Sequence, residues 1–433
     1  MNKIRTVKAA EHIGTAVIIE GWLQHHRRHG NISFLVIRDG WGTIQVVCEN
    51  PEVIEQLEAI ALESIVSVQG KVVEMAQAPN GVEIHQPEVR VITAVSHPLP
   101  LTINKREIKA ALPTQLDHAV FTNRHPKRQA TFRLSAGVMA GFRQTLNAQQ
   151  FTEIQSPKLV ASATESGANV FELGYFGRPA YLAQSPQFYK QIMVGIFERV
   201  YEVGPVFRAE PHNTSRHINQ YVSLDVEFGF IENHFTVMAM LENVITGILR
   251  FLATHHEREL SLLNVKLPEA KRPFPHIHFS EAKALIQKSE PKLATEEHDL
   301  APAEERWLGE WANKEFGSAF LFVTGYPMPK RPFYTHPEPN DPAYSNSFDL
   351  LFNGLELVTG GQRLHTYESY LEALIKAQLS PEPFETYLEA FKFGMPPHGG
   401  FAIGLERFLT QLIGFSNVRL ATLFPRDINR LTP

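Results

Sequence analysis

Short runs in which apolar and polar residues alternate fill the first hundred positions of the chain. Five such runs are rich in β-branched and aromatic residues and are separated by turn sequences such as DGWG and PNG, a pattern typical of strands. A stretch with helical spacing, PEVIEQLEAIALE, lies between the third and fourth runs. Five strands with a helix in this position follow the order of an OB-fold, a barrel that commonly binds oligonucleotides. The predicted strands lie within 15–23, 32–39, 42–49, 64–73 and 82–92.

A different pattern follows the predicted barrel. A proline-containing stretch without a clear period predicts a linker, and after it apolar residues recur near helical spacing over 129–150. Strand-like runs then alternate irregularly with helices up to the end of the chain. Because helices do not separate these strands regularly, we expect a mostly antiparallel sheet flanked by helices. The predicted fold class is therefore α+β, with an OB-fold domain over 1–97, a linker over 98–127 and a second domain over 128–433.

The composition is that of an ordinary folded protein, since 43% of the residues are hydrophobic and 20% are charged. The one cysteine, Cys48, excludes an internal disulfide and a multi-thiolate metal site. No run approaches the roughly 20 apolar residues that span a bilayer, and the first residues lack the apolar segment of a signal peptide. We therefore expect a cytoplasmic protein with no membrane association.

One stretch of the predicted barrel is locally basic, although the net charge of −5 does not favour nucleic acid. Residues 24–38 contain Arg27, Arg28 and Arg38 around Phe34, with three histidines and no acidic residue. Cations beside an exposed aromatic ring hold single-stranded nucleic acid through phosphate contacts and base stacking. A solvated hairpin explains the same residues, and the pattern alone leaves both interpretations open.

A second cation-rich stretch, FRAEPHNTSRH (207–217), lies between two apolar strands. An internal pair between Arg208 and Glu210 would explain these two residues alone. The loop also carries Arg216 and His217, and an acidic strand follows it. Two strands joined by such a cation-rich loop form a fork that suits a triphosphate, so the stretch predicts a nucleotide site.

A glycine-rich strand enters a helix near the end of the chain, in GGFAIGLERFLTQLIG (399–414). Glycines permit close approach of a ligand, and Arg407 at the helix start offers a second cation to a triphosphate. We find neither GxxxxGK[ST] nor GxGxxG after a strand, which removes two common nucleotide-binding frameworks.

Together these segments resemble a known family. FRAE followed by an acidic strand, and GLER at 404–407, resemble the second and third signature motifs of class II aminoacyl-tRNA synthetases. FTEIQSPKL resembles the first motif, whose strand and proline, here Pro157, usually lie at a dimer interface. ATESGANVF, YLAQSPQFYKQIM, SFDLLFNGLELVTGGQRLH and MPPHGGFAIGLERF extend the likeness, over nearly the whole chain, to aspartyl-tRNA synthetases of the compact archaeal type.

The resemblance implies a site for ATP with magnesium. It implies that Arg208 contacts the α-phosphate and the substrate carboxylate, that Tyr221 stacks on adenine, and that Arg407 clamps the γ-phosphate. Gln220 stands where many relatives have Glu. Glu356 and Thr359 match the family's Mg²⁺ ligands, with Thr in place of the usual Ser. The implied ATP-binding residues are Arg208, Ala209, Glu210, Arg216, His217, Ile218, Tyr221, Glu356, Gly404, Leu405, Glu406 and Arg407.

The resemblance also implies a site for L-aspartate. Lys190 and Arg363 would reach the side-chain carboxylate, and Glu165 and Asp225 would take the α-amino group. An asparagine pocket needs only neutral hydrogen-bonding partners, so two cations favour aspartate. The implied aspartate-binding residues are Glu165, Ser185, Gln187, Lys190, Arg208, Asp225, Thr359 and Arg363, with Arg208 and Arg407 as the catalytic pair.

The implied tRNA contacts decide between two specificities. Phe34 and Gln45 match residues that read the middle anticodon base, and Arg27 and Arg28 lie where backbone and first-base contacts are made. Strict members have Trp and Lys where this chain has Gln24 and Pro79. A lost lysine at a base edge removes a donor that could separate the last base of tRNA-Asp from that of tRNA-Asn. The expectation is a non-discriminating homodimer that charges both tRNAs and needs a tRNA-dependent amidotransferase downstream.

Four alternatives stand beside this expectation. The first is an aspartyl enzyme that charges tRNA-Asp alone. The second is an asparaginyl-tRNA synthetase, against which Lys190 argues. The third is an ammonia-using asparagine synthetase, which lacks the anticodon-binding barrel that is predicted for this chain. The fourth is a paralogue without catalytic activity, whose motifs would be degenerate, whereas Arg208, Glu356, Arg363 and Arg407 are all in place.

Overall fold

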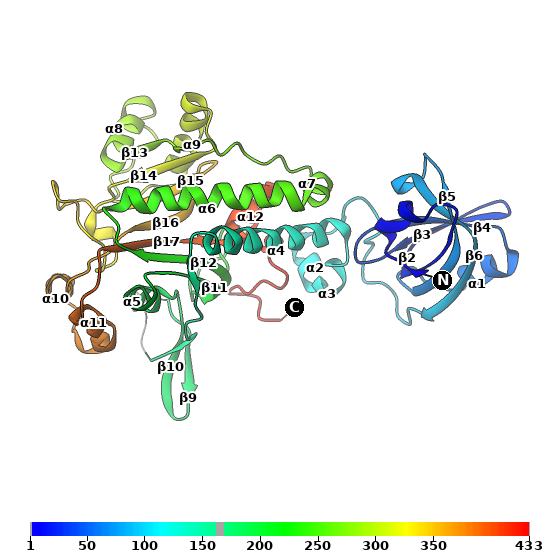
Figure 1. The fold of residues 1–433 in the computed structure, drawn as a ribbon, viewed down its shortest axis with the longest axis horizontal. Coiled ribbons are helices and arrows are strands. Elements are labelled where there is room, and N and C mark those ends of the chain that lie inside the picture. Colours follow the sequence, from blue (N-terminus) through cyan, green and yellow to red (C-terminus); the bar gives the residue numbers. More distant parts are fainter. Residues whose placement is uncertain (1, 162–168, 433) are drawn as a thin grey trace. The chain divides into compact units, whose positions relative to one another are not determined.

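The computed structural model describes residues 2–161 and 169–432, and the chain divides into two compact units, Met1–Pro126 and Lys127–Pro433 (Figure 1). The first unit contains a barrel whose strands run in the order β1-β2-β3-β4-β6-β5, and β2 also pairs with β5. This second pairing closes the barrel and removes its free edges. The predicted OB-fold is confirmed. The strands are β1 (Asn2–Lys3), β2 (Ala16–His29), β3 (Ile32–Arg38), β4 (Thr43–Cys48), β5 (Ile65–Glu74) and β6 (Val82–Thr93).

Strand alternation fills the barrel interior with aliphatic side chains such as Val17, Leu35 and Val68, which are fully buried. The predicted helix after the third long strand is α1 (Pro51–Glu58), and the Asn50 side chain caps it by accepting a hydrogen bond from the Glu52 N–H. The other helices of this unit, some within the segment predicted as a linker, are η1 (Thr6–His12), η2 (Pro79–Gly81), α2 (Leu112–Asp117) and α3 (Ala119–Thr122).

An eight-stranded sheet organises the described part of the second unit, in the order β13-β14-β15-β16-β17-β12-β11-β7. Neighbours from β14 to β11 are antiparallel, and β13 and β7 pair in parallel at the two edges. The predicted antiparallel sheet is confirmed. Its strands are β7 (Thr152–Glu153), β11 (Arg199–Phe207), β12 (Gln220–Gly229), β13 (His276–His278), β14 (Phe320–Thr324), β15 (Ser347–Phe352), β16 (Leu355–Gln362) and β17 (His398–Gly404), and a small separate sheet has β8 (Leu159–Val160), β9 (Glu172–Tyr175) and β10 (Arg178–Leu182).

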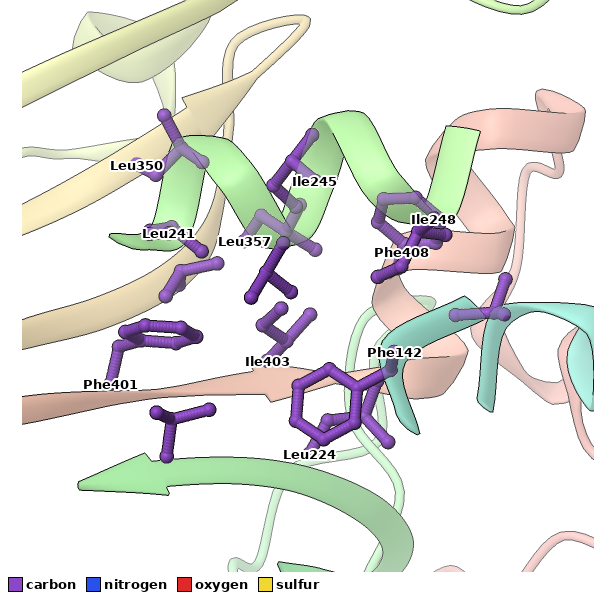
Figure 2. Close-up of a cluster of buried hydrophobic side chains, with 14 of the residues drawn as sticks. Phe142, Leu224, Leu241, Ile245, Ile248, Leu350, Leu357, Phe401, Ile403 and Phe408 are labelled. Atoms are coloured by element: carbon purple, nitrogen blue, oxygen red, sulfur yellow. The ribbon is translucent and has the colours of Figure 1, made fainter. Parts of the chain in front are cut away.

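Two long helices, α4 (Pro126–Asn147) and α6 (His234–His255), pack against one face of the large sheet. In Figure 2, Ile245 of α6 and Phe142 of α4 meet Ile403 of the sheet in the main core. Within the described residues, α6 is the one helix long and apolar enough to cross a membrane, whereas no such segment was predicted from the sequence. Its burial in this core accounts for its apolar character.

Shorter helices surround the rest of the sheet. Phe188 of α5 packs with Tyr370 of α10 and Tyr387 of α11 in a separate aromatic cluster. Another cluster joins helices α8 and α9 to β13–β15. The remaining helices are α5 (Gln187–Phe197), α7 (Glu257–Leu263), α8 (Phe279–Ser289), α9 (Pro302–Phe316), η3 (Met328–Lys330), α10 (Tyr367–Lys376), η4 (Glu382–Phe384), α11 (Glu385–Lys392), α12 (Leu405–Ile413) and η5 (Val418–Ala421).

Candidate active site and nucleic-acid interface

Strand β12 separates the core from a polar face of the sheet. Leu224 and Val226 belong to the core under α4 and α6. Because side chains alternate along a strand, Ser223, Asp225 and Glu227 point to the opposite face. The antiparallel partner β17 brings Ala402 and Gly404 beside this polar row. The functional residues are therefore carried on the sheet face away from the two long helices.

A cavity of about 170 Å³ opens on this face, and both Arg208 and Arg407 line it. Arg208 directly follows β11, which ends at Phe207, and Arg407 lies in the first turn of α12. The two predicted catalytic cations thus come from distant parts of the sequence to one hollow. The full lining is Arg208, Glu210, Arg216, His217, Ile218, Tyr221, Ser223, Glu356, Leu357, Thr359, Ala402, Gly404, Glu406, Arg407 and Val418.

The cavity holds several cations that its own carboxylates contact only loosely. Arg208 lies 3.9 Å from Glu210, and Arg407 lies 3.8 Å from Glu356, while the Arg208 guanidinium is 5.8 Å from the Tyr221 ring centre. Burial lowers the pKa of His217, against the influence of nearby Glu210, so this imidazole offers an N–H rather than a full charge at neutral pH. An anionic ligand with several phosphates fits such a lining.

One corner of the cavity is acidic. The Thr359 hydroxyl donates to Glu356 at 3.1 Å, and Asp349 is paired with Thr359 across β15 and β16. Burial raises the pKa of Asp349 to about 6, although Arg331 acts against the shift. Burial and the charge of Glu356 raise the pKa of Glu305 to about 7. Arg331 pairs with Asp349 at 3.0 Å, whereas Glu305 has only a loose contact, 3.9 Å from Arg216.

Among the described residues no group of three or more histidine, cysteine or carboxylate side chains has metal-ligand geometry. Two protein oxygens with phosphates completing the shell are what Mg²⁺ prefers, and Glu356 with Thr359 would supply the two protein oxygens. Burial and the charge of Glu356 hold the nearby Glu305 back from ionising, and a divalent cation at this corner would relieve the repulsion between the two acids. Asp349 and Glu305 were not predicted as part of the site. For Asp349, an acidic residue inside the apolar strand SFDLLF was the feature of the sequence that indicated a buried carboxylate.

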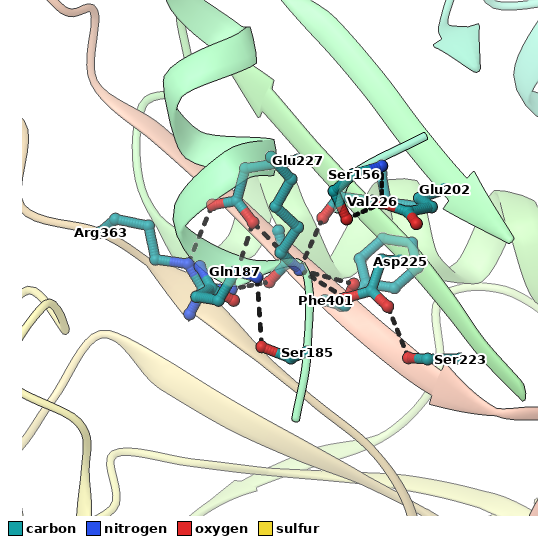
Figure 3. A network of polar contacts seen from close by, with 12 residues as sticks. Ser156, Ser185, Gln187, Glu202, Ser223, Asp225, Val226, Glu227, Arg363 and Phe401 are labelled. Carbon is teal, nitrogen blue, oxygen red and sulfur yellow. Dashed lines mark hydrogen bonds and ion pairs between the residues drawn. The ribbon is translucent and has the colours of Figure 1, made fainter. Parts of the chain in front are cut away.

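Four buried charged groups form a network further along β12 (Figure 3). Lys190 Nζ lies 3.0 Å from Asp225 Oδ1 and 3.3 Å from Glu227 Oε2. Arg363 Nε donates to Glu227 Oε1 at 2.9 Å. Burial pushes the pKa of Glu227 upward, but Arg363 and Lys190 hold it below its ordinary value, so Glu227 is ionised. Ser223, which lines the cavity, donates to Asp225 and links the two regions.

Glu227 has no role assigned from the sequence, but the structure shows that it is central to this network. It accepts from one predicted aspartate-binding cation and contacts the other. The neighbouring strand β17 needs glycine at position 400 to lie this close to Glu227. A Cβ there would lie 2.2 Å from Glu227 Oε2 and 2.0 Å from the Val226 carbonyl oxygen. Two acids at 225 and 227 between apolar residues were the available signal that buried cations oppose them.

The other predicted residues of this site fall into three groups. Ser185 and Gln187 are buried at the start of α5, where the Ser185 hydroxyl accepts from the Gln187 N–H at 3.1 Å. Ala209 and Leu405 flank the cavity without being part of its lining, and Leu405 belongs to the core. Glu165 lies outside the described residues.

The predicted nucleic-acid residues gather on the outer face of the barrel. Arg27 is directly opposite Phe34 across β2 and β3, and Arg27 is exposed while Phe34 is half-buried. Gln45 Nε2 donates to Glu83 Oε2 at 2.8 Å across β4 and β6. His85 contacts the other Glu83 oxygen at 2.6 Å. The buried carboxylate of Glu83 thus fixes the Gln45 amide, a role that the sequence did not reveal.

The two residues expected to govern discrimination differ in what the structure shows. Gln24 lies at an irregularity of β2, is 8% exposed and leaves its Oε1 without a partner among the described residues. Pro79 begins η2, and its side chain lies outside the described residues. Arg28 pairs with Glu58 of α1 at 3.0 Å.

This combination of a closed barrel and an antiparallel sheet with two converging arginines defines a class of protein. Residues 112–428 match the family "tRNA synthetases class II (D, K and N)", and residues 17–92 match the "OB-fold nucleic acid binding domain" family. The chain belongs to the class II aminoacyl-tRNA synthetases of this group.

Several individual proteins are similar to this chain over nearly its whole length. The chain is 46% identical to the "Aspartate--tRNA(Asp/Asn) ligase" of Thermus thermophilus over 99% of both chains. It is 38% identical to the "Aspartate--tRNA(Asp) ligase" of Pyrococcus furiosus over 97% of both. Among solved structures, the asparaginyl-tRNA synthetase of Pyrococcus horikoshii with asparaginyl-adenylate is similar with a TM-score of 0.90 and 31% identity, covering 98% of this chain and 97% of that one.

Proposed function

We propose that this enzyme attaches L-aspartate to tRNA in two ATP-dependent steps and accepts both tRNA-Asp and tRNA-Asn. The observation that carries the proposal is the meeting of two buried cations, Lys190 and Arg363, at Glu227 beside the cavity lined by Arg208 and Arg407. Relatives that are 43–46% identical to this chain bear the name of the same reaction.

In the first step a carboxylate oxygen of aspartate attacks the α-phosphorus of ATP, and the bond to the leaving pyrophosphate breaks. In the second, a terminal hydroxyl of tRNA attacks the activated carbonyl carbon and AMP leaves. No side chain need act as a covalent nucleophile. Arg208 would neutralise the charge that develops at the α-phosphate, and Arg407 would hold the departing pyrophosphate.

Magnesium is part of the proposal. When bound, Mg²⁺ would compensate phosphate charge that the arginines leave unmatched. Glu356 and Thr359 would hold it, with Asp349 behind them on the neighbouring strand. Glu406 would hold the start of α12, and with it Arg407, against β12, because its carboxylate accepts from the Val222 N–H at 3.1 Å.

Aspartate is favoured over asparagine by charge. A carboxylate side chain can be neutralised by Lys190 or Arg363, whereas a neutral amide leaves both cations to Asp225 and Glu227 alone. The similarity to asparaginyl-tRNA synthetases in fold does not bear on this choice, because the sheet is common to both. ATP–pyrophosphate exchange with each amino acid tests it, and exchange with asparagine alone would refute the proposal.

Relaxed tRNA specificity rests on Gln24 and Pro79, which replace the Trp and Lys expected of strict members. The experiment offers purified protein equal amounts of tRNA-Asp and tRNA-Asn transcripts and measures aspartate incorporation into each. We expect kcat/KM values within about tenfold of each other, less than a discriminating base contact would give. Charging of tRNA-Asp alone would leave an aspartyl enzyme of strict specificity instead.

Two partners follow from this proposal. Asp-tRNA-Asn needs conversion, so a tRNA-dependent amidotransferase should act downstream of the enzyme. A homodimer is supported by the first-motif likeness, which here covers α4 and the edge strand β7 with Pro157 after it. Sedimentation equilibrium of the purified protein measures the dimer directly.

A further inference from the structure

A closed network of uncharged polar groups lies directly behind the buried charges, and none of its members belongs to the predicted site. Gln191 follows Lys190 on α5, and its side chain meets Tyr370, Tyr387 and His398. All four are nearly or fully buried: Gln191, Tyr370 and His398 at 0% exposure and Tyr387 at 4%. Such a network is costly unless every group in it is satisfied.

The contacts fix the position of each hydrogen. His398 Nδ1 lies 2.9 Å from the Pro396 carbonyl oxygen, which can only accept, so Nδ1 carries the proton. His398 Nε2, 3.0 Å from Gln191 Nε2, must then accept from the amide. The imidazole is neutral with a defined tautomer. Burial lowers the pKa of His398 to about 4, against the nearby carboxylate of Glu227.

The Gln191 amide is held just as firmly. Its Nε2 donates to the Tyr370 hydroxyl at 3.1 Å as well as to His398, and its Oε1 accepts from the Tyr387 hydroxyl at 2.8 Å. The two tyrosine hydroxyls are 2.8 Å apart. Because Tyr387 has one hydroxyl hydrogen and gives it to Gln191, Tyr370 donates to Tyr387. Turning the amide over would break this ring.

His398 also touches the second cation-bearing element. The backbone carbonyl oxygen of His398 accepts from the backbone N–H of Arg363 at 2.9 Å. Two residues further on, the Gly400 carbonyl oxygen accepts from Arg363 Nη2 of the guanidinium at 3.1 Å. The side chain of His398 therefore anchors the helix that carries Lys190, while its backbone anchors Arg363. The titratable groups that influence the pKa of His398 are Glu227, Arg363 and His365.

We propose that His398 is a positioning residue for aspartate selection: as a neutral imidazole it fixes the Gln191 amide and leaves Glu227 to the two cations, Lys190 and Arg363. A protonated His398 would add a third cation near Glu227 and would force the Gln191 amide to turn. The inference rests on the proposed function, because it concerns the binding of the same aspartate.

Two variants with an amide side chain separate the roles of the two ring nitrogens of His398. His398→Asn keeps a donor near the place of Nδ1 but removes the acceptor for Gln191, and His398→Gln keeps an acceptor near Nε2. In aspartate-dependent ATP–pyrophosphate exchange, we expect His398→Asn to raise KM for aspartate about tenfold with KM for ATP within about twofold. His398→Gln should recover most of this loss. The ratio of exchange with aspartate to exchange with asparagine should fall in His398→Asn.

Tyr387→Phe provides an independent test that keeps the ring and removes only the hydroxyl that donates to Gln191. It should raise KM for aspartate in the same direction. The matched control is His234→Asn, a buried histidine at the start of α6 with no place in the network, which should leave both KM values unchanged.

Wild-type exchange is measured first, since its failure with aspartate would refute the proposed function rather than the role of His398. Given wild-type activity, the inference is overturned if folded His398→Asn and Tyr387→Phe keep the wild-type KM for aspartate. Parallel changes in the KM values for aspartate and ATP would overturn it too, because a general loss of structure predicts them.

Discussion

Arg407 reaches the cavity from the first turn of α12, where its guanidinium also donates to the Glu356 carbonyl at 3.2 Å. Removing a preorganised cation that stabilises phosphate charge costs roughly 100-fold or more in rate. We expect Arg407→Ala to lower the rate of ATP–pyrophosphate exchange by about that factor. Arg407→Lys should recover only part of the rate, because lysine keeps the charge but lacks the planar fork of arginine. The exposed Arg250→Ala on α6 is the control. A loss below about threefold in Arg407→Ala would contradict the role.

Glu406 is a buried carboxylate with backbone partners and no described cation beside it. Burial raises its pKa to about 7 from an ordinary value of 4.5. The folded state therefore binds more protons than the unfolded state between these values, so the contribution of Glu406 to stability falls as pH rises from about 5 to 8.

The variant Glu406→Gln should lack this loss. The unfolding free energy of the variant relative to wild type should rise by up to about 3 kcal/mol between pH 5 and pH 8. Urea denaturation at four pH values measures it, with the exposed Glu257→Gln as control. Parallel pH profiles for Glu406→Gln and wild type would show that the group does not titrate as its burial implies.

At the scale of elements, the pairing of β12 with β17 sets the geometry of the charged network. Glu227 and Gly400 are direct partners in this pairing, and a Cβ at position 400 would overlap both the Val226 carbonyl and the Glu227 carboxylate. Gly400→Ala should therefore separate the two strands, lower the unfolding free energy by roughly 3 kcal/mol and abolish exchange.

Thermal unfolding and exchange assays check this prediction. The control is Gly174→Ala on β9, where an added Cβ meets nothing within 4 Å. If Gly400→Ala binds aspartate normally, then strand spacing is not what positions Glu227.

At the scale of the whole molecule, the barrel and the cavity-bearing sheet belong to different compact units, and the proposed function divides tRNA reading and amino-acid activation between them. Phe34→Ala on the barrel should leave aspartate-dependent exchange unchanged, because exchange needs no tRNA. It should raise KM for both tRNAs about tenfold or more in aminoacylation, since stacking on an aromatic ring contributes roughly 1–3 kcal/mol per base. Phe316→Ala, an exposed phenylalanine of the catalytic unit, is the matched control. Unchanged aminoacylation by Phe34→Ala would remove the barrel from the proposed interface.

Helices and strands could be predicted from the sequence far better than the contacts between them. The barrel strands and α1 have local periodicity, which is enough to specify them. The converging arginines were expected from motif likeness. Glu227, Glu83 and His398 were not assigned, because each acts through a partner more than 35 residues away, as when Glu83 holds Gln45. Local patterns do not encode such distances.

By itself, then, the sequence determined which segments become strands and helices, because burial of an apolar face requires only a repeat of two or about 3.6 residues. It also determined the inventory of charges, including Arg208, Lys190 and Arg407. Only the tertiary structure decided which carboxylate answers which cation, and which histidine stays neutral. Those choices depend on desolvation and on distances of about 3 Å, and both arise only when strands distant in the chain are paired.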